Sequence, residues 1–318
     1  MEKVELGNTG IMTTPVGMGV LTIGRNQLDL PLGRGAEIVR YALDRGIDFL
    51  DTAQFYQTYP YIREALKGTS HKPVIASKSL VHSYRDMSDS VNEMREALGI
   101  DTVDIFLLHE VRGEDDFARR AGAWQCLNDL KAGGGVRAIG ISTHYVDVAE
   151  LNSRLPESDL IFPLINKYSL GIRHYDGPGD KNAMAAAIRA NKDAGKGCFA
   201  MKVFGGGNLT GSYLKCLDYV SGLYGVDSMM IGIGAEHEVD RLVEYAEGRI
   251  DREYRPDISG KRIRVDQGDC EGCGACVKQC PNKSMFINEH GLAEVNQETC
   301  LTCGYCAPVC PCRAILLY

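Results

Sequence analysis

The chain has 318 residues and a formal net charge of −7 at pH 7. This length suits one large domain with a small one, and the acidic balance argues against nucleic acid or an anionic membrane as partner. No apolar run approaches the roughly 20 residues of a transmembrane helix, and residues 1–10 lack the apolar core of a secretory signal. We therefore expect a soluble, cytoplasmic protein.

Residues 1–250 alternate short apolar runs with amphipathic stretches, after a hairpin-like segment at residues 3–14. The runs are nearly continuous in apolar residues, which is typical of strands buried on both faces of a parallel sheet. Apolar spacing of i, i+3, i+4 predicts helices at residues 33–46, 84–99 and 238–248. The expected strands are residues 15–20, 47–52, 73–78, 103–109, 137–143, 161–168, 198–204 and 228–234.

Eight such β/α units in about 250 residues fit a closed (β/α)8 TIM barrel, an α/β fold, better than an open doubly wound sheet. No GxGxxG follows the first strand, so the phosphate loop of a Rossmann fold is missing. The charged segment 249–264 contains Pro256 and Gly260 and predicts a linker. We therefore expect a barrel domain over residues 1–255 and a small C-terminal α+β domain over residues 260–318.

Eight of the twelve cysteines lie in the C-terminal domain in two copies of the run C-x2-C-x2-C-x3-C-P. This is the ligand run of a bacterial-type ferredoxin domain with two [4Fe–4S] clusters, in which the fourth cysteine of each run binds the other cluster. The rule predicts a first cluster on Cys270, Cys273, Cys276 and Cys310, and a second on Cys300, Cys303, Cys306 and Cys280.

Two other uses of these cysteines are disfavoured. Structural zinc sites use two CxxC pairs rather than this run, and disulfides do not suit a reducing compartment. Residues 284–296 alternate around a glycine and predict a hairpin, and residues 314–318 predict a last short strand. Cys312 lies just past the second run, and we expect no ligand role for it.

The ends of the expected barrel strands carry a chemically coherent set of side chains. Catalytic residues of such barrels stand at the carboxyl ends of the strands. A lysine ammonium favours the phenolate of a neighbouring tyrosine and so lowers its pKa, while an aspartate fixes the lysine. A histidine can hydrogen-bond a substrate carbonyl, so the set predicts a proton donor for a forming alkoxide. The four residues are Asp51, Tyr56, Lys78 and His109.

Three segments make this pattern specific: GIDFLDTAQFY (46–56), VIASKS (74–79) and DIFLLHE (104–110). With the opening LGNTGIMTTPVGMGV, they resemble signature segments of the aldo-keto reductase superfamily over residues 1–248. The resemblance implies that the four residues above are the catalytic tetrad of that family, with the tyrosine as general acid.

The resemblance also implies a nicotinamide cofactor, NAD(P). Ser142 and Thr143 match a Ser-Asn pair that holds the nicotinamide carboxamide in the family. Asn166 is the nearest match to a Gln that the family has at the end of the sixth strand. Met201, which also suits the barrel core, or Lys202 stands where a tyrosine stacks on the ring. Glycines let backbone amides approach an anion, although a glycine run also suits a flexible loop. The candidate cofactor-binding residues are Ser142, Thr143, Asn166, Met201, Lys202, Gly205, Gly206 and Gly234.

Two carboxylates stand where relatives that use NADPH carry basic residues. Glu236 and Glu238 would repel a 2′-phosphate and can accept from ribose hydroxyls, which favours NAD over NADP. A flavin is a third option, because it exchanges electrons both singly and in pairs, whereas nicotinamide moves hydride.

We therefore predict an iron–sulfur oxidoreductase that reduces a small-molecule carbonyl, or oxidises an alcohol, with Tyr56 as general acid/base. The clusters would pass electrons to or from the barrel or an electron-transfer protein partner. The alternative is an electron-transfer or redox-sensing protein whose barrel binds a nucleotide or flavin without carbonyl chemistry. The cluster domain takes the place of a C-terminal substrate loop, and we expect it to close over the barrel mouth.

Overall fold

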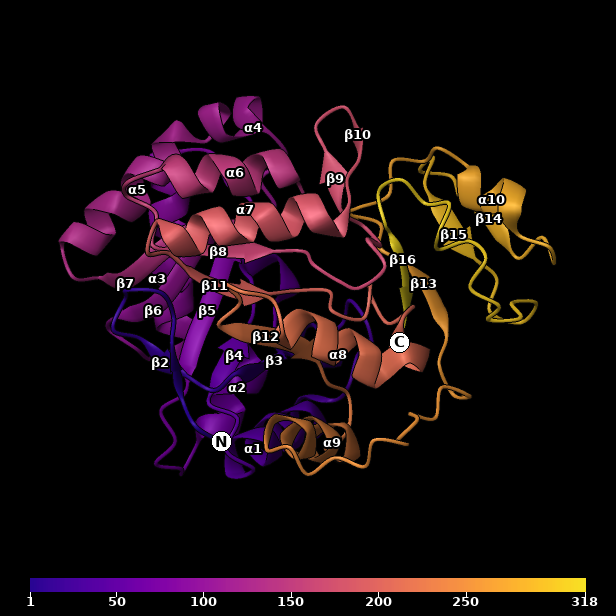
Figure 1. Ribbon diagram of the computed structural model, residues 1–318, viewed down its shortest axis with the longest axis horizontal. Helices are drawn as coiled ribbons and strands as arrows, with labels where there is room; N and C mark the ends of the chain where they lie inside the picture. Colours follow the sequence, from indigo (N-terminus) through magenta and orange to yellow (C-terminus); the bar gives the residue numbers. More distant parts are fainter.

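The computed structural model describes residues 1–318 and contains a closed barrel of parallel strands surrounded by helices (Figure 1). This confirms the predicted (β/α)8 fold. Around the barrel the strand order is β11-β12-β3-β4-β5-β6-β7-β8. The strands are β3 (Val16–Gly19), β4 (Phe49–Asp51), β5 (Val74–Ser79), β6 (Val103–Leu108), β7 (Val136–Thr143), β8 (Leu160–Pro163), β11 (Gly197–Ala200) and β12 (Ser228–Gly232).

The helices form where the sequence supplies caps and an apolar stripe. Ser83 accepts a hydrogen bond from the Asp86 N–H at the start of α3, and Gly99 ends this helix with φ +69°. Three predicted helices are confirmed to within two residues at each end, as α1, α3 and α9. The helices are α1 (Leu32–Asp44), α2 (Tyr59–Leu66), α3 (Tyr84–Leu98), α4 (Glu114–Arg119), α5 (Ala121–Ala132), α6 (Val146–Arg154), α7 (Lys181–Asp193), α8 (Tyr213–Ser221), α9 (Glu236–Ala246) and α10 (Ala275–Gln279), with short 3-10 turns η1 (Val20–Ile23), η2 (Gln54–Tyr56) and η3 (Thr210–Ser212).

An N-terminal hairpin closes the bottom of the barrel, as predicted. Its strands β1 (Val4–Glu5) and β2 (Met12–Thr13) pair antiparallel. Leu6 and Ile11 in its loop are fully buried and join the apolar cluster inside the barrel. That cluster also contains Phe49 and Phe199, whose ring centroids lie 5.1 Å apart. The lower barrel is therefore a filled core, and chemistry is left to the opposite end.

Two barrel strands end earlier than the sequence suggested. β8 ends at Pro163 rather than at residue 168, and β11 ends at Ala200 rather than at residue 204. The side chain of Asn166 folds the following residues into a turn by accepting from the Leu170 N–H at 2.9 Å. Lys202 adopts a φ of +54°, which is incompatible with an extended strand.

The cluster module, residues 261–318, contains two small antiparallel sheets. β13 (Ile263–Val265) pairs with the last strand β16 (Ile315–Leu317), and β14 (Met285–Ile287) pairs with β15 (Ala293–Val295). The second pair is the predicted hairpin, and β16 is the predicted terminal strand. Ile263, Met285 and Ile315 form a small core together with cysteine side chains.

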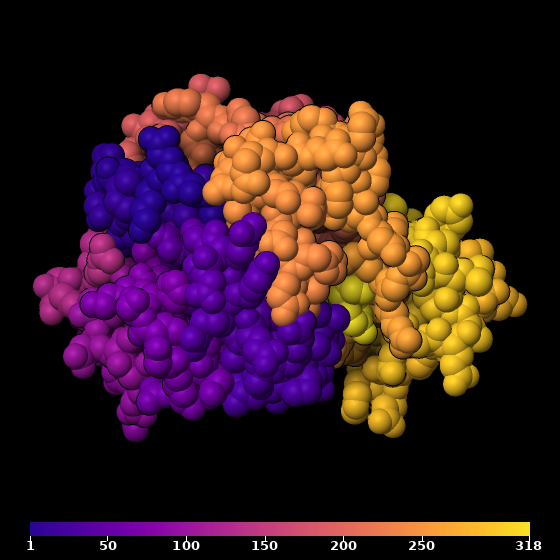
Figure 2. All heavy atoms as spheres, turned by 90° about the horizontal axis from the view of Figure 1, so that it is seen from below, coloured from indigo at the N-terminus to yellow at the C-terminus, as the bar shows by residue number.

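The module lies against the barrel and extends outward from it on one side (Figures 1 and 2). The Leu317 N–H donates to the Gly206 carbonyl at 2.8 Å, and Asn208 Nδ2 donates to the Ile315 carbonyl at 2.9 Å. At Gly207 a Cβ atom would stand 1.7 Å from the Leu317 carbonyl, so this close approach requires glycine. Gly206 and Gly207 follow β11, so the module docks at the carboxyl end of the barrel strands.

The remaining regular structure is the short hairpin of β9 (Arg173–His174) and β10 (Gly177–Pro178), which lies near the module in Figure 1. No helix of the chain has the length and apolar character that crossing a bilayer requires.

Candidate functional site

The four predicted catalytic side chains meet at the carboxyl end of the barrel. Asp51 is the last residue of β4, and Tyr56 ends the turn η2 that follows. Lys78 lies near the end of β5, and His109 directly follows β6. The parallel pairing of β4 with β5 and of β5 with β6 brings these ends together, so residues 58 positions apart in the chain share one site.

A buried ion pair forms the base of this site. Lys78 Nζ donates to Asp51 Oδ1 at 2.7 Å and to the Thr52 carbonyl at 2.7 Å. The same Nζ lies 4.9 Å from the centroid of the Tyr56 ring, and the Tyr56 hydroxyl lies 3.4 Å from His109 Nε2. The tyrosine ring thus lies beside the lysine, and its hydroxyl lies beside the histidine.

The charge environment differs from the sequence expectation for the tyrosine. Burial is the largest influence and raises the pKa of Tyr56 well above its ordinary value, and the carboxylates of Asp51, Asp269 and Asp266 raise it further. Burial also lowers the pKa of the neighbouring Lys78. The expected lowering of the tyrosine pKa is therefore wrong for this structure, and the Tyr56 hydroxyl stays protonated at neutral pH.

The imidazole of His109 is held neutral at this site. Burial lowers its pKa well below the ordinary histidine value, and the positive charges of Lys78 and Arg120 lower it further. Arg120 also donates to the His109 carbonyl at 2.7 Å and is itself paired with Asp116. His109 Nδ1 is buried without a hydrogen-bond partner, which is unusual for a buried polar atom and typical of functional sites.

Acidic residues that the sequence did not single out also line the mouth. The module brings in Asp266 and Asp269, and Lys202 Nζ lies 3.6 Å from Asp269 Oδ2. Glu110 lies beside Arg112, with Oε1 and Nη2 separated by 3.1 Å, and its pKa is raised by burial and then by Asp269. Glu110 and Lys202 both have positive φ values, of 50° and 54°, so the mouth also contains strained backbone.

The hydroxyls of Ser142 and Thr143, which were predicted to hold the nicotinamide carboxamide, form hydrogen bonds within the protein. Ser142 Oγ accepts from the Glu110 N–H at 2.8 Å, which leaves its own proton free. Thr143 Oγ1 donates to the Val111 carbonyl at 2.7 Å and accepts from the Tyr145 N–H at 3.0 Å. Both side chains therefore fix the loop after β6.

Asn166 is more fully engaged. Its Nδ2 donates to the carbonyls of Leu170 and Lys202, and its Oδ1 accepts from the N–H groups of Tyr168 and Leu170. A side-chain amide has two donors and two acceptor positions, and all four are occupied. Met201 forms a bridge to Leu164 at the barrel rim. A role of Asn166 or Met201 in binding a nicotinamide remains a prediction.

The predicted phosphate loop serves first as the docking surface of β16. Gly205, Gly206 and Gly207 all have positive φ values, and the Gly206 carbonyl is bonded to the last strand. After β12, the Gly234 N–H donates to Glu238 Oε2 at 2.7 Å. A role of these glycines in binding a cofactor remains a prediction.

The cysteines divide into two groups in space. One small apolar cavity is lined by four cysteines from both runs, together with Leu301 and Met285; they are Cys280, Cys300, Cys303 and Cys306. These are the four cysteines expected for the second cluster, and Cys280 of the first run lies among the cysteines of the second run. No three Cys, His, Asp or Glu side chains converge closely enough to hold a single metal ion. A cubane is larger than an ion, and its four ligands stand further apart.

The remaining predicted ligands lie nearer the barrel. Cys270 directly follows Asp269, which faces Lys202, and Cys276 and Cys310 are buried in the module core. The N–H groups of Gly272 and Ala293 donate to Cys270 Sγ at 3.4 and 3.3 Å. Such bonds to sulfur are a means by which proteins tune cluster potentials, so this donor set fits an iron–sulfur cluster.

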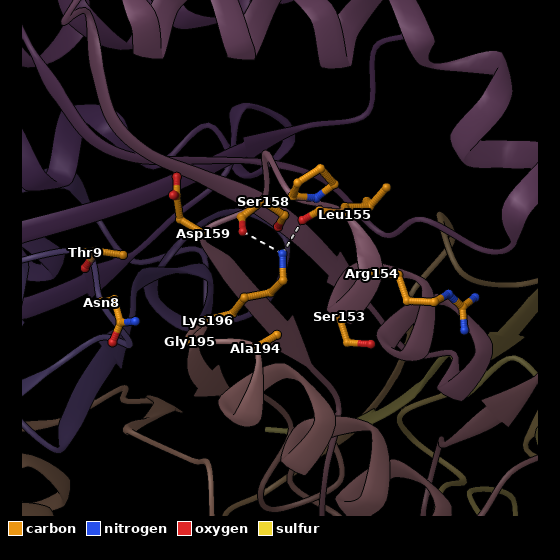
Figure 3. Close-up of a pocket in the computed structure, with 11 residues that line it drawn as sticks. Asn8, Thr9, Ser153, Arg154, Leu155, Ser158, Asp159, Ala194, Gly195 and Lys196 are labelled. Atoms are coloured by element: carbon orange, nitrogen blue, oxygen red, sulfur yellow. Dashed lines mark hydrogen bonds between the residues drawn. The ribbon is translucent and has the colours of Figure 1, made fainter.

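A separate polar cavity of about 320 Å³ lies at the bottom of the barrel, beside the N-terminal hairpin (Figure 3). Its buried Lys196 donates to the carbonyls of Leu155 and Ser158, so the ammonium is used to tie the loop after α6. Asn8 and Asp159 line other sides. The cavity lies at the opposite end from Tyr56 and holds none of the predicted site residues.

Comparisons with known proteins agree with this arrangement. Residues 15–248 match the model of the aldo/keto reductase family, and residues 262–311 match that of the 4Fe-4S dicluster domain. The 6-dehydroglucose reductase of Novosphingobium aromaticivorans is 28% identical over 180 residues, which are 48% of this chain and 55% of the relative. The NADH-specific methylglyoxal reductase of Escherichia coli is 28% identical over 187 residues, which are 50% of this chain and 57% of the relative.

The chain thus spans little more than half the length of these curated relatives. Among solved structures, a putative aldo-keto reductase from Pseudomonas aeruginosa superposes with a TM-score of 0.64 at 23% identity, covering 77% of this chain and 94% of that one. The holo form of aldo-keto reductase AKR11C1 from Bacillus halodurans gives 0.61 at 19% identity, covering 78% and 91%. These two likenesses concern the fold. The family match covers well over half of the chain, so this protein belongs to the aldo/keto reductase family and also carries a 4Fe–4S dicluster domain.

Proposed function

We propose that this chain interconverts a small-molecule carbonyl and its alcohol at Tyr56, and that the two clusters carry the electrons. The observation that supports this most is the convergence of Tyr56, His109 and the buried Lys78–Asp51 pair at the barrel end on which the cluster module docks. The division into a barrel over residues 1–255 and a cluster domain over residues 260–318 is part of this proposal.

The roles of the side chains follow from their protonation. A neutral His109 donates from Nε2 to the carbonyl oxygen, and the unpartnered Nδ1 is then its unprotonated nitrogen. Tyr56 stays protonated until a strong base forms next to it, and an alkoxide is such a base. Lys78, fixed by Asp51, places positive charge near the proton that leaves. In the reverse direction the same groups accept the proton of an alcohol.

The electron count sets what else is needed. Reducing a carbonyl to an alcohol consumes two electrons and two protons: Tyr56 supplies the proton for the oxygen, and water supplies the proton that forms the new C–H bond. The two clusters, ligated as predicted from the sequence, each supply or accept one electron when bound. The Cys270 group lies beside the mouth because Asp269 reaches Lys202, so this group is the inner one of the two.

The barrel cofactor is the least constrained part of the proposal. Because Asn166 has no free hydrogen-bonding group and Thr143 has no free donor, we assign no hydride step to a nicotinamide. If a nicotinamide binds with rearrangement, NAD is favoured over NADP, because the carboxylate of Glu238 occupies the Gly234 N–H. A flavin would link single electrons to pairs. The visible spectrum of anaerobically purified protein, with analysis of any released nucleotide, distinguishes these cases.

The fully bonded Asn166 also favours the second candidate function, an electron-transfer or redox-sensing protein whose barrel performs no carbonyl chemistry. Tyr56→Phe separates the two. We expect the variant to lose 10²–10⁴-fold in turnover of carbonyl probes, the usual contribution of a general acid. Methylglyoxal, the substrate in the name of one relative, is the first probe.

The matched control is Tyr224→Phe, because Tyr224 is exposed and its hydroxyl contacts only Asp193, before β11 at the other end of the barrel. Equal turnover by Tyr56→Phe and the control would exclude Tyr56 as the proton donor and leave the second function.

A further inference from the structure

Exposed apolar side chains surround the cysteine group that lies further from the barrel. Leu301 is 66% exposed and Tyr305 is 60% exposed, and both lie within the second cysteine run. Leu301 lines the same cavity as Cys280 and Cys303. Exposed apolar side chains that gather at one site, rather than lying singly, mark surfaces that bind partners.

This end of the module takes no part in docking to the barrel. The contacts to the barrel come from Asp269, Glu271, Arg264 and the strand β16. In Figure 1, the yellow loop between β15 and β16, which contains the second cysteine run, extends on the side of the module away from the barrel. The second cysteine group therefore faces outward while the first faces the mouth.

Exposed charges of both signs lie on the module, and Glu298 stands two residues before the second cysteine run. Asp269 and Glu271 pair with barrel cations. Lys278 and Lys283 lie on either side of Cys280, are exposed, and have no carboxylate within ion-pair distance. An apolar centre with unpaired lysines beside it is the composition of a docking face for an acidic partner, since opposite charge speeds and orients encounter.

We propose that this outer face, made by Lys278, Lys283, Leu301 and Tyr305, docks a small acidic iron–sulfur carrier protein of the ferredoxin type. The proposal rests on the proposed function, because it supplies the electrons that the barrel consumes. The step moves one electron: the carrier cluster is oxidised, the outer cluster is reduced, and no bond or proton is exchanged. An iron–sulfur carrier suits the site because clusters of one type have overlapping potentials.

The test follows reduction of the clusters by their visible absorbance in anaerobic stopped flow, with full-length holoprotein. The probes are a reduced acidic bacterial ferredoxin, a reduced flavodoxin and the small dye methyl viologen. We expect the Lys278→Glu/Lys283→Glu variant to react with ferredoxin at least about tenfold more slowly at low salt, with the difference shrinking as salt rises. Reduction by the dye stays at the wild-type rate.

The control for charge is Lys72→Glu, an exposed lysine before β5 at the bottom of the barrel. Leu301→Ser/Tyr305→Ser tests the apolar part, and where that variant loses iron, the lysine variant alone decides. Wild-type rates of the lysine variant with ferredoxin would overturn the proposal. So would a preference for flavodoxin, or self-association of the chain through this face in sedimentation. Because carbonyl turnover is not the readout, failure of the Tyr56 chemistry is detected separately.

Discussion

Replacing Asp51 with asparagine should destabilise the barrel, because it removes one partner of a buried ion pair. The side chains of Asp51 and Lys78 are 8% and 1% exposed, and 2.7 Å separates Oδ1 from Nζ. In the variant, the ammonium keeps its bond to the Thr52 carbonyl but has no counter-charge. Breaking a buried pair costs about 3–5 kcal/mol. We expect about 3 kcal/mol, the lower end, since the asparagine oxygen still accepts a hydrogen bond.

The chain contains a single tryptophan, Trp124, which is 8% exposed on α5, so its fluorescence reports unfolding of the barrel alone. Denaturant titrations of Asp51→Asn, Lys78→Met and the double variant give the coupling energy of the pair. The double variant should be more stable than the sum of the single effects predicts. The control is Asp44→Asn, which breaks an exposed contact to His71 and should cost under about 1 kcal/mol. A loss below 1 kcal/mol for Asp51→Asn, with additive effects, would refute the assignment of a buried charged pair.

Three further predictions concern the same region. Burial lowers the pKa of His109 from 6.5 in the folded chain, so below about pH 6.5 the unfolded chain binds one more proton than the folded chain. The free energy of unfolding should therefore fall as the pH drops below about 6.5, by up to about 1.4 kcal/mol per pH unit. His109→Gln should reduce that slope in the same denaturant titrations, and an unchanged slope would contradict the burial of a neutral imidazole. Cys312 Sγ lies 3.6 Å from Cys310 Sγ, so its thiol can donate a hydrogen bond to this predicted ligand of the inner cluster. Cys312→Ala removes that donor and should lower the reduction potential of the inner cluster in an EPR-monitored redox titration. The control Cys216→Ala, in α8, should leave the potential unchanged. The methyl group of Gly207→Ala would clash with the Leu317 carbonyl, and this should loosen the docking of the module. Limited proteolysis within residues 249–262 should then become faster. The control is Gly248→Ala, which has φ +69° and open space and so carries the backbone strain without the clash; equal proteolysis of the two variants would contradict the docking role.

Much of the barrel was predictable because its signals are local. Continuous apolar runs and helical spacing repeat along the chain, and a closed parallel barrel must bring the ends of consecutive strands together. That is why Asp51, Lys78 and His109, each at a strand end, lie within one site. The cysteine spacing was equally local, and it predicted that Cys280 lies among the second group.

The parts that were not predictable depend on how the module docks. Asp266 and Asp269 precede Cys270 and show no pattern of their own, but in the fold they raise the pKa of Tyr56. For the same reason, Gly206 and Gly207 suggested a phosphate loop, whereas their contacts are with the terminal strand. The hydrogen-bond partners of the Asn166 side chain were also not predictable from the sequence, because they belong to a turn that forms where β8 ends early.

The claim that the barrel and the clusters work as one enzyme is tested most directly by a single turnover. Clusters of the anaerobic protein are reduced, excess reductant is removed, and methylglyoxal is added while the visible absorbance of the clusters is followed. We predict that both clusters reoxidise, with one alcohol formed for every two electrons released, and that Tyr56→Phe with reduced clusters does so at least 10²-fold more slowly. Alcohol that forms at the wild-type rate while the clusters stay reduced would contradict this account.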